Sequence, residues 1–197
     1  MIRKYTTVII IVFLLILNSC NASDRKTTIY IQAFDDCPNQ KIEQLKTDLE
    51  KIIGNVVVNK SIALPYFALN DLKTRYRADK LIRFLAQNTP LNGVTLGVTT
   101  KDISTTKGKY ADWGVMGLGY CPGKSCVISS YRLKGKNQQE KLFKVAIHEL
   151  GHTQGLPHCP DKSCYMRDAE GKDHLNEEIH FCGKCKNHLI KRGWDLK

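Results

Sequence analysis

The segment HELGHTQGLPHC, residues 148–159, places three histidines at spacings that suit a single metal ion. His148 and His152 are four residues apart, so on a helix both imidazoles project from the same face and can bind one zinc ion. Gly155 allows the backbone to bend sharply, so that His158 can return as a third ligand. Three neutral imidazoles do not offset the positive charge of the zinc ion, and they leave one of its coordination positions open. Both features are typical of a catalytic rather than a structural zinc site.

Glu149 lies on the same predicted helix, rotated by about one third of a turn from the first histidine. This position suits a residue that holds a water molecule beside the metal rather than one that binds the metal itself. The alternative is that the histidines are ordinary core residues, but a buried apolar helix rarely carries two histidines and a glutamate without a partner for them. The sequence therefore predicts a catalytic metal site with Glu149 as general base.

The residues before this motif, KNQQEKLFKVAI (136–147), predict the helix that carries it. Apolar residues occur over most of its circumference, so we expect a central, buried helix. Asn137 is expected to cap its start, with Glu140 three residues further on, and Gly151 or Gly155 to loosen its end.

Predicted strands and helices alternate upstream of this helix. Strands are predicted at residues 27–34, 55–58 and 93–100, and helices at 39–54 and 75–87. This order predicts an α/β sheet with helices packed on it. Asn39 is expected to cap the first helix. Residues 113–133 predict two extended pieces joined by a Pro-Gly turn, which form a hairpin at the edge of the sheet.

The N-terminus predicts export and lipid anchoring. Arg3 and Lys4 precede an apolar run over residues 8–17, which is too short to span a bilayer but suits a signal peptide. The run ends in LNSC, which resembles a bacterial lipobox. The predicted boundaries are a lipoprotein signal peptide at 1–19, a lipidated tether at 20–26 that begins with acylated Cys20, and a single domain at 27–197. The alternative is an ordinary secretory signal in which Cys20 is incidental.

Four more cysteines follow the histidine motif, in a C-terminal part that is too polar for a core of its own. They are Cys159, Cys164, Cys182 and Cys185. Two cysteine pairs separated by a loop have the spacing of a tetrahedral structural zinc site. In an exported protein the same thiols could instead form two local disulfides, Cys159–Cys164 and Cys182–Cys185.

The combined array resembles the archaemetzincin family of zinc metalloproteases, in the metzincin clan. The family signature joins H-E-x-x-H-x-x-G-x-x-H to Cys, four residues, Cys-x-Met, a spacer and Cys-x-x-Cys. The matching positions, in order, are His148, Glu149, His152, Gly155, His158, Cys159, Cys164, Met166, Cys182 and Cys185. The spacer of 15 residues between Met166 and Cys182 is shorter than in the family pattern.

The resemblance implies a compact metzincin-like α/β domain: a mixed twisted sheet with an antiparallel edge strand, helices packed on it, an active-site helix and a small C-terminal part stapled by zinc. It implies two zinc ions, a catalytic one at His148, His152 and His158 and a structural one at the four cysteines. Because of this match we favour zinc over disulfides there. Met166 would form the methionine turn beneath the catalytic site; the alternative is an ordinary core methionine.

The composition adds two observations to this picture. The chain has 197 residues with 30 Lys or Arg and 19 Asp or Glu, a formal charge of +11 that falls to +9 once the leader is removed. In an exported protein this excess indicates a solvated surface or anionic surroundings rather than nucleic-acid binding. Of the remaining cysteines, Cys121 and Cys126 flank the Pro-Gly turn and could form a disulfide, which leaves Cys37 unassigned.

The predicted function is a zinc-dependent metallopeptidase, anchored by lipid on the periplasmic side or the cell surface. Its expected partners are a peptide or protein substrate, which could extend along the edge hairpin, and the membrane; we expect a monomer and no nucleic acid. One alternative is a zinc-stabilised binding or assembly lipoprotein with little hydrolytic activity. Another is a cytoplasmic peptidase or nucleic-acid zinc protein whose N-terminus only resembles a signal.

Overall fold

The computed structural model describes residues 26–169 and 171–197. The predicted signal peptide and lipidated Cys20 lie outside these residues. The strands are β1 (Thr28–Ala33), β2 (Val56–Val58), β3 (Tyr76–Arg77), β4 (Gly93–Thr99), β5 (Ile103–Lys107), β6 (Tyr110–Val115), β7 (Gly117–Gly119) and β8 (Ser125–Ser129). The helices are α1 (Asn39–Glu50), α2 (Ala78–Gln87), α3 (Gln138–Thr153) and α4 (Gly183–Lys191), with a 3-10 turn at Tyr66–Ala68.

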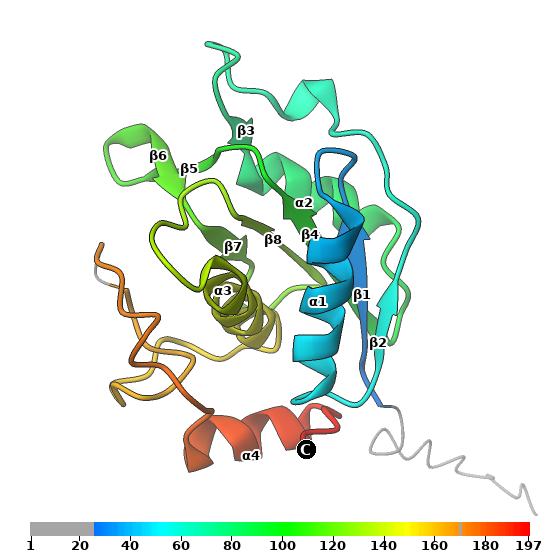
Figure 1. The fold of residues 1–197 in the computed structure, drawn as a ribbon, viewed down its shortest axis with the longest axis vertical. Helices are drawn as coiled ribbons and strands as arrows, with labels where there is room; N and C mark the ends of the chain where they lie inside the picture. Colours follow the sequence, from blue (N-terminus) through cyan, green and yellow to red (C-terminus); the bar gives the residue numbers. More distant parts are fainter. Residues whose placement is uncertain (1–25, 170) are drawn as a thin grey trace, which may run out of the picture.

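The larger sheet has five strands in the order β2-β1-β4-β8-β7 (Figure 1). The first four strands are mutually parallel, and β7 pairs antiparallel to β8, with Gly117 opposite Ile128. The prediction of a mixed sheet with an antiparallel edge strand is therefore confirmed. The predicted hairpin is formed by β7 and β8, but only β7 lies at the edge, because β8 also pairs with β4.

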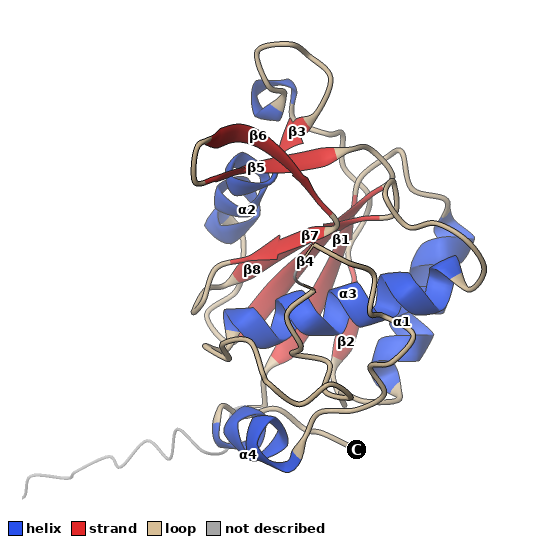
Figure 2. Cartoon of the chain, turned by 90° about the vertical axis from the view of Figure 1, so that its left-hand side faces the viewer, coloured by secondary structure: helices blue, strands red, loops and turns tan. Residues whose placement is uncertain are grey.

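Helices cover both faces of this sheet (Figure 2). Helices α1 and α3 pack on one face and α2 on the other, and successive side chains of a strand alternate between the two cores. On β8, Cys126 and Ile128 face the core beneath α1 and α3, whereas Val127 faces the core beneath α2. Helix α3 is buried along most of its length, as predicted, and crosses the sheet next to β7.

A second sheet, of order β3-β5-β6, was not predicted from the sequence. Its strands carry few buried side chains, so they lack the apolar alternation that marks a strand. Ion pairs tie it to the rest of the domain instead: the carboxylate of Asp102 accepts hydrogen bonds from Arg75 and, at both oxygens, from Arg132. In Figure 2 this sheet lies above β7, and its residues Lys107 and Trp113 form part of the wall of a cavity beside α3.

The predicted helix caps are wrong at two positions. Helix α1 is preceded by Pro38 at the cap position, so Asn39 is the first helical residue. Asn137 does precede α3, but it adopts a left-handed conformation with φ 60° and its side chain makes no capping hydrogen bond. Side-chain capping requires an extended backbone at that residue. Glu140 instead pairs with Lys144, Oε1 to Nζ 2.7 Å.

The possible disulfide between Cys121 and Cys126 is not formed, because both thiols are free. Cys126 is fully buried beneath α3. Cys121 lies beyond the paired part of the hairpin, is exposed, and places its Sγ 3.4 Å from the carbonyl oxygen of Leu156. The two side chains therefore point to different surroundings. Cys37 is buried, and its thiol donates a hydrogen bond to the Val98 carbonyl, 3.2 Å.

The C-terminal part contains a helix, α4, that its polar composition did not predict. This part contributes three buried side chains to the core beneath α1 and α3, those of Phe181, Leu189 and Trp194. Its end returns to the beginning of the domain, where Lys26 pairs with Asp195, Nζ to Oδ2 2.8 Å. No helix within residues 26–169 and 171–197 is long and apolar enough to cross a membrane.

Candidate metal centres

The structure brings the three predicted histidines together. Helix α3 carries His148 and His152, and their Nε2 atoms lie 3.0 Å apart. Gly155 ends the helix with φ +87°, and the chain turns back so that the ring centroid of His158 lies 5.4 Å and 5.0 Å from those of His148 and His152. One ring nitrogen from each of the three lies within 4.8 Å of the others.

Backbone carbonyls orient the two helical imidazoles. Nδ1 of His148 lies 2.7 Å from the oxygen of Tyr165, and Nδ1 of His152 lies 2.7 Å from the oxygen of Leu156. A carbonyl oxygen can only accept a hydrogen bond, so each Nδ1 carries the proton and each Nε2 presents a lone pair. The lone pairs of the two rings therefore face the same point.

The electrostatics of this cluster fit a cation. Burial, with the neighbouring His152, lowers the pKa of His148 to about 3, and burial lowers the pKa of His152, so both rings are neutral near pH 7. Two facing lone pairs at 3.0 Å repel unless a cation lies between them. Nitrogens bound at 2.0–2.1 Å to a tetrahedral zinc are roughly 3.3 Å apart, close to this spacing. Nδ1 of His158 lies 3.1 Å from Oδ2 of Asp168, an outer carboxylate of the kind that orients metal-binding histidines.

Glu149 is buried between α3 and the edge strand β7. Two glycines of β7 make room for it: a Cβ at Gly117 would lie 2.6 Å from Glu149 Cγ, and one at Gly119 would lie 2.6 Å from the Glu149 carbonyl oxygen. Burial raises the pKa of the Glu149 carboxyl to about 8, and the backbone amide of Gly119 offsets part of that rise. A divalent cation at the neighbouring imidazoles would lower this pKa again.

Met166 lies directly under the metal-binding turn of α3. It is fully buried, and its Sδ occupies the space that a Cβ at Gly151 would need. Gly151 is one residue before His152, so the methionine supports the helix at the level of the imidazoles. Gly151 therefore does not loosen the end of the helix; Gly155 ends it.

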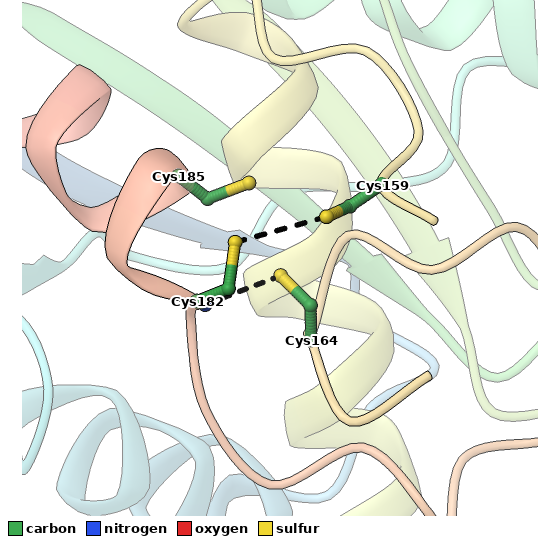
Figure 3. Close-up of side chains that lie close together, drawn as sticks. All are labelled: Cys159, Cys164, Cys182 and Cys185. Carbon is green, nitrogen blue, oxygen red and sulfur yellow. Dashed lines mark hydrogen bonds between the residues drawn. The ribbon is translucent and has the colours of Figure 1, made fainter. Parts of the chain in front are cut away.

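The four C-terminal cysteines form a second cluster (Figure 3). Their Sγ atoms all lie within 4.8 Å of one another, and those of Cys159 and Cys182 are 3.7 Å apart. Sulfurs bound at 2.3 Å to a tetrahedral zinc are roughly 3.8 Å apart, so this spacing fits a zinc ion. Cys159 and Cys164 come from the loop after α3, whereas Cys182 precedes α4 and Cys185 lies in its first turn.

The cluster carries no disulfide, so the two local pairings considered from the sequence are not formed. The Sγ atom of Cys159 lies 3.7 Å from that of Cys182, a cysteine of the other pair. Burial raises the pKa of the Cys164 thiol to about 11 and raises that of Cys185 further. Four thiolates this close need a cation to hold them ionised, which is the condition that a structural zinc provides.

A cavity of about 480 Å³ opens beside His148 and Glu149. Its walls come from β6 and β7 on one side and from residues 167–169 and 171–178 on the other, with Val145 of α3 between them. A larger cavity of about 610 Å³ lies elsewhere, lined by residues such as Gly93, Pro122 and Arg192, and neither metal cluster contributes to it.

The family model of peptidase family M54 matches residues 38–192, which include both clusters. This chain belongs to the archaemetzincins, family M54. The archaemetzincin of Archaeoglobus fulgidus is 31% identical over 165 residues, covering 82% of this chain and 98% of that protein.

Solved archaemetzincin structures agree with the fold. The crystal structure of the Archaeoglobus fulgidus protein in complex with malonate has a TM-score of 0.68 at 29% identity and covers 82% of this chain and 99% of that one. The crystal structure of the archaemetzincin of Methanopyrus kandleri has a TM-score of 0.71 at 27% identity. It covers 86% of this chain and 96% of that one. The archaemetzincin described here is therefore a zinc metallopeptidase with the predicted fold.

Several residues of this archaemetzincin site were not singled out from the sequence. The pair Gly117 and Gly119 was detectable in principle, since glycines two apart in a strand mark one face where another segment approaches closely. Asp168 and Glu178 carry no local signal, because the loop after Met166 brings them to the cavity only in the folded chain.

Proposed function

We propose that this archaemetzincin hydrolyses peptide bonds in the cavity beneath β7, with Glu149 as general base and His148, His152 and His158 as ligands of a catalytic zinc. The observation that carries this proposal is the convergence of three imidazoles beside one buried carboxylate. Zinc at this position supplies a Lewis acid, which acidifies water and polarises the scissile carbonyl.

Glu149 performs the proton transfers in this scheme. Its carboxylate takes a proton from the attacking water and passes it to the leaving amine. Burial against β7 raises the pKa of the carboxyl to about 8, which suits donation of the proton to the leaving amine. A zinc ion at the neighbouring imidazoles would lower this pKa, so that the carboxylate can accept the proton of the water. The glycines of β7 fix the distance between this carboxylate and the sheet edge.

The substrate is proposed to bind as an extended strand along β7. This strand pairs with β8 on one side and is the last strand of its sheet on the other. An edge strand offers free backbone groups to an extended peptide, and β7 lies next to the Glu149 side chain. A peptide paired there would have its backbone within reach of the reacting groups.

The four cysteines are proposed to hold a second, structural zinc. Cys159 directly follows His158, so one short segment would serve both metals. Through the cysteines, this zinc would fix α4 against the loop that returns His158 to the active site.

The N-terminal segment is proposed to be a lipoprotein signal at 1–19, with acylated Cys20 and a tether to residue 26, so that a monomeric enzyme is held at a membrane outside the cytoplasm. Support comes from the order of charge, apolar run and cysteine. Labelling cells with an alkyne fatty acid tests this assignment: wild type should incorporate the label, and Cys20→Ala should not. A soluble, unlabelled product would contradict it.

The Glu149→Gln variant tests the catalytic assignment. It should lose peptide hydrolysis by at least about a thousandfold while retaining two zinc ions per chain and the wild-type unfolding transition. Unchanged turnover would contradict the role of Glu149. Two bound zinc ions with no hydrolysis of a broad peptide library by the wild type would favour a binding lipoprotein instead.

A further inference from the structure

Glu178 is a buried carboxylate in the wall of the catalytic cavity. Its side chain is 3% exposed and lines the cavity together with Val145 and His148. Its Oε2 atom has no hydrogen-bond partner among the described residues, and no ion pair within 4.0 Å is formed by either oxygen with them. A buried, unpaired carboxylate is costly, so such a group usually indicates a missing partner.

The charges around Glu178 are otherwise matched in pairs. Lys144 pairs with Glu140 at 2.7 Å. Lys141 and Asp173 form a second pair, at 2.5 Å. With these two lysines engaged, Glu178 has no ion-pair partner of its own among the described residues.

The remaining cations near the cavity are engaged or exposed. Arg167 pairs with Glu177 at 2.6 Å. Arg132, on the β6 side, donates two hydrogen bonds to Asp102. Two lysines are the other cations that line the cavity. Lys107 lies over the ring of Trp113, and Lys172 is exposed to solvent.

We propose that the pocket beside Glu178 binds the cationic side chain of a lysine or arginine of the substrate, next to the bond that is cleaved. This proposal rests on the proposed function, because it names the substrate class of the same site. An ammonium or guanidinium group would supply the hydrogen-bond donors that Glu178 lacks, and would do so in a buried place where a charge-assisted bond is strong.

The distance of the pocket from the three histidines determines how far the cationic residue of the substrate lies from the cleaved bond. Val145 is three residues before His148, so the pocket is one helical turn from the first metal ligand on the same face of α3. A side chain that enters it from a peptide bound along β7 therefore belongs to a residue beside the scissile bond. Aliphatic contacts with Val145 and Leu175, both lining the cavity, suit the methylene stem of lysine or arginine.

Binding can be measured separately from cleavage. The zinc-loaded full-length Glu149→Gln variant is titrated with fluorescein-labelled decapeptides of alanine and serine that contain one lysine, and with the same peptides carrying norleucine. A second pair compares arginine with citrulline. We expect the cationic member of each pair to bind at least about tenfold more tightly. Adding Glu178→Gln should abolish this preference.

Glu43→Gln is the matched control, since it removes an exposed carboxylate of α1 that does not line the cavity. It should leave the preference intact. Equal affinity of the cationic and neutral peptides in the Glu149→Gln protein overturns the proposal without the need for any Glu178 variant. An equal loss in Glu43→Gln and Glu178→Gln also overturns it, because the effect would then be one of net charge.

Cleavage of the same peptides by the zinc-loaded wild type separates this proposal from the proposed function. Lysine and arginine should raise kcat/KM at a single position beside the cleaved bond, and Glu178→Gln should remove that enrichment. Cleavage with no cationic preference overturns the pocket assignment and leaves the peptidase intact. A cationic preference in binding with no cleavage of any peptide contradicts the proposed function and supports the pocket.

Discussion

Gly117 of β7 lies against the side chain of Glu149, so closely that a Cβ at Gly117 would fall 2.6 Å from Glu149 Cγ. The edge strand and the carboxylate therefore fix each other's position. Gly117→Ala should displace one of the two and lower kcat/KM by about ten- to a hundredfold. Steady-state kinetics on the zinc-loaded protein check this. Zinc content should remain at two per chain, and wild-type activity in this variant would show that the contact has no catalytic consequence.

Gly151→Ala should destabilise the domain by about 1–3 kcal/mol, because the new methyl group would occupy the space of Met166 Sδ. Urea unfolding of the zinc-loaded protein measures this change in the free energy of unfolding. Met166→Ala combined with Gly151→Ala should be less destabilised than the sum of the two single variants. Additive effects would mean that the two residues do not interact as described.

Cys185→Ser should reduce bound zinc from two ions to one per chain and lower the thermal unfolding midpoint. Because Cys159 and His158 are adjacent, we also expect peptidase activity to fall at least about tenfold. Metal analysis by mass spectrometry, calorimetry and kinetics test the three effects. Cys121→Ser is the control, since this exposed thiol lies outside the cluster and should leave zinc content unchanged. Two retained zinc ions in Cys185→Ser would contradict the four-cysteine site.

Glu178→Gln should stabilise the protein more at high pH than at low pH. Burial raises the pKa of Glu178 from 4.5 to about 7, and the attraction of Lys144 and Arg167 offsets only part of this rise, while Asp173 and Glu177 add to it. Below pH 4.5 the carboxyl is protonated in both the folded and the unfolded state and has no effect. Between pH 4.5 and 7 the unfolded chain loses the proton more readily, so the folded state is progressively destabilised.

The gain from Glu178→Gln should accordingly be small at pH 4.5 and reach about 1–3 kcal/mol at pH 8.5. Urea unfolding of wild type and variant at both pH values measures it, and Glu43→Gln on the surface of α1 serves as the comparison. A gain of the same size at both pH values would mean that Glu178 is ionised normally in the folded protein.

The main sheet and the metal ligands were predictable because their signals are local. Strands β1 and β4 are apolar enough to be recognised, and the spacing of His148 and His152 determines that they share a helix face. The second sheet was not predictable, since β5 and β6 are polar and are held by ion pairs with distant residues.

The candidate site shows the same division. Sequence spacing predicts which histidines and cysteines gather, whereas the support around them depends on tertiary packing. Glu178 looks like any surface glutamate in NEEIH, and only the folded chain shows that Lys144 and Lys141 are already paired with other carboxylates. The capping error at Asn137 also depends on the backbone, because this residue is left-handed and its side chain makes no capping hydrogen bond.

The two ends of the described domain meet at one corner. The backbone amide of Thr27 donates to the carbonyl of Gly193, and Leu196 forms a bridge with Ile53. The backbone from residue 26 to residue 197 thus returns close to its starting point, so the path through the fold does not require a break at this corner. Joining residue 197 to residue 26 through a short linker and opening the exposed turn at Asp71–Leu72 should give a permuted domain with both metal clusters.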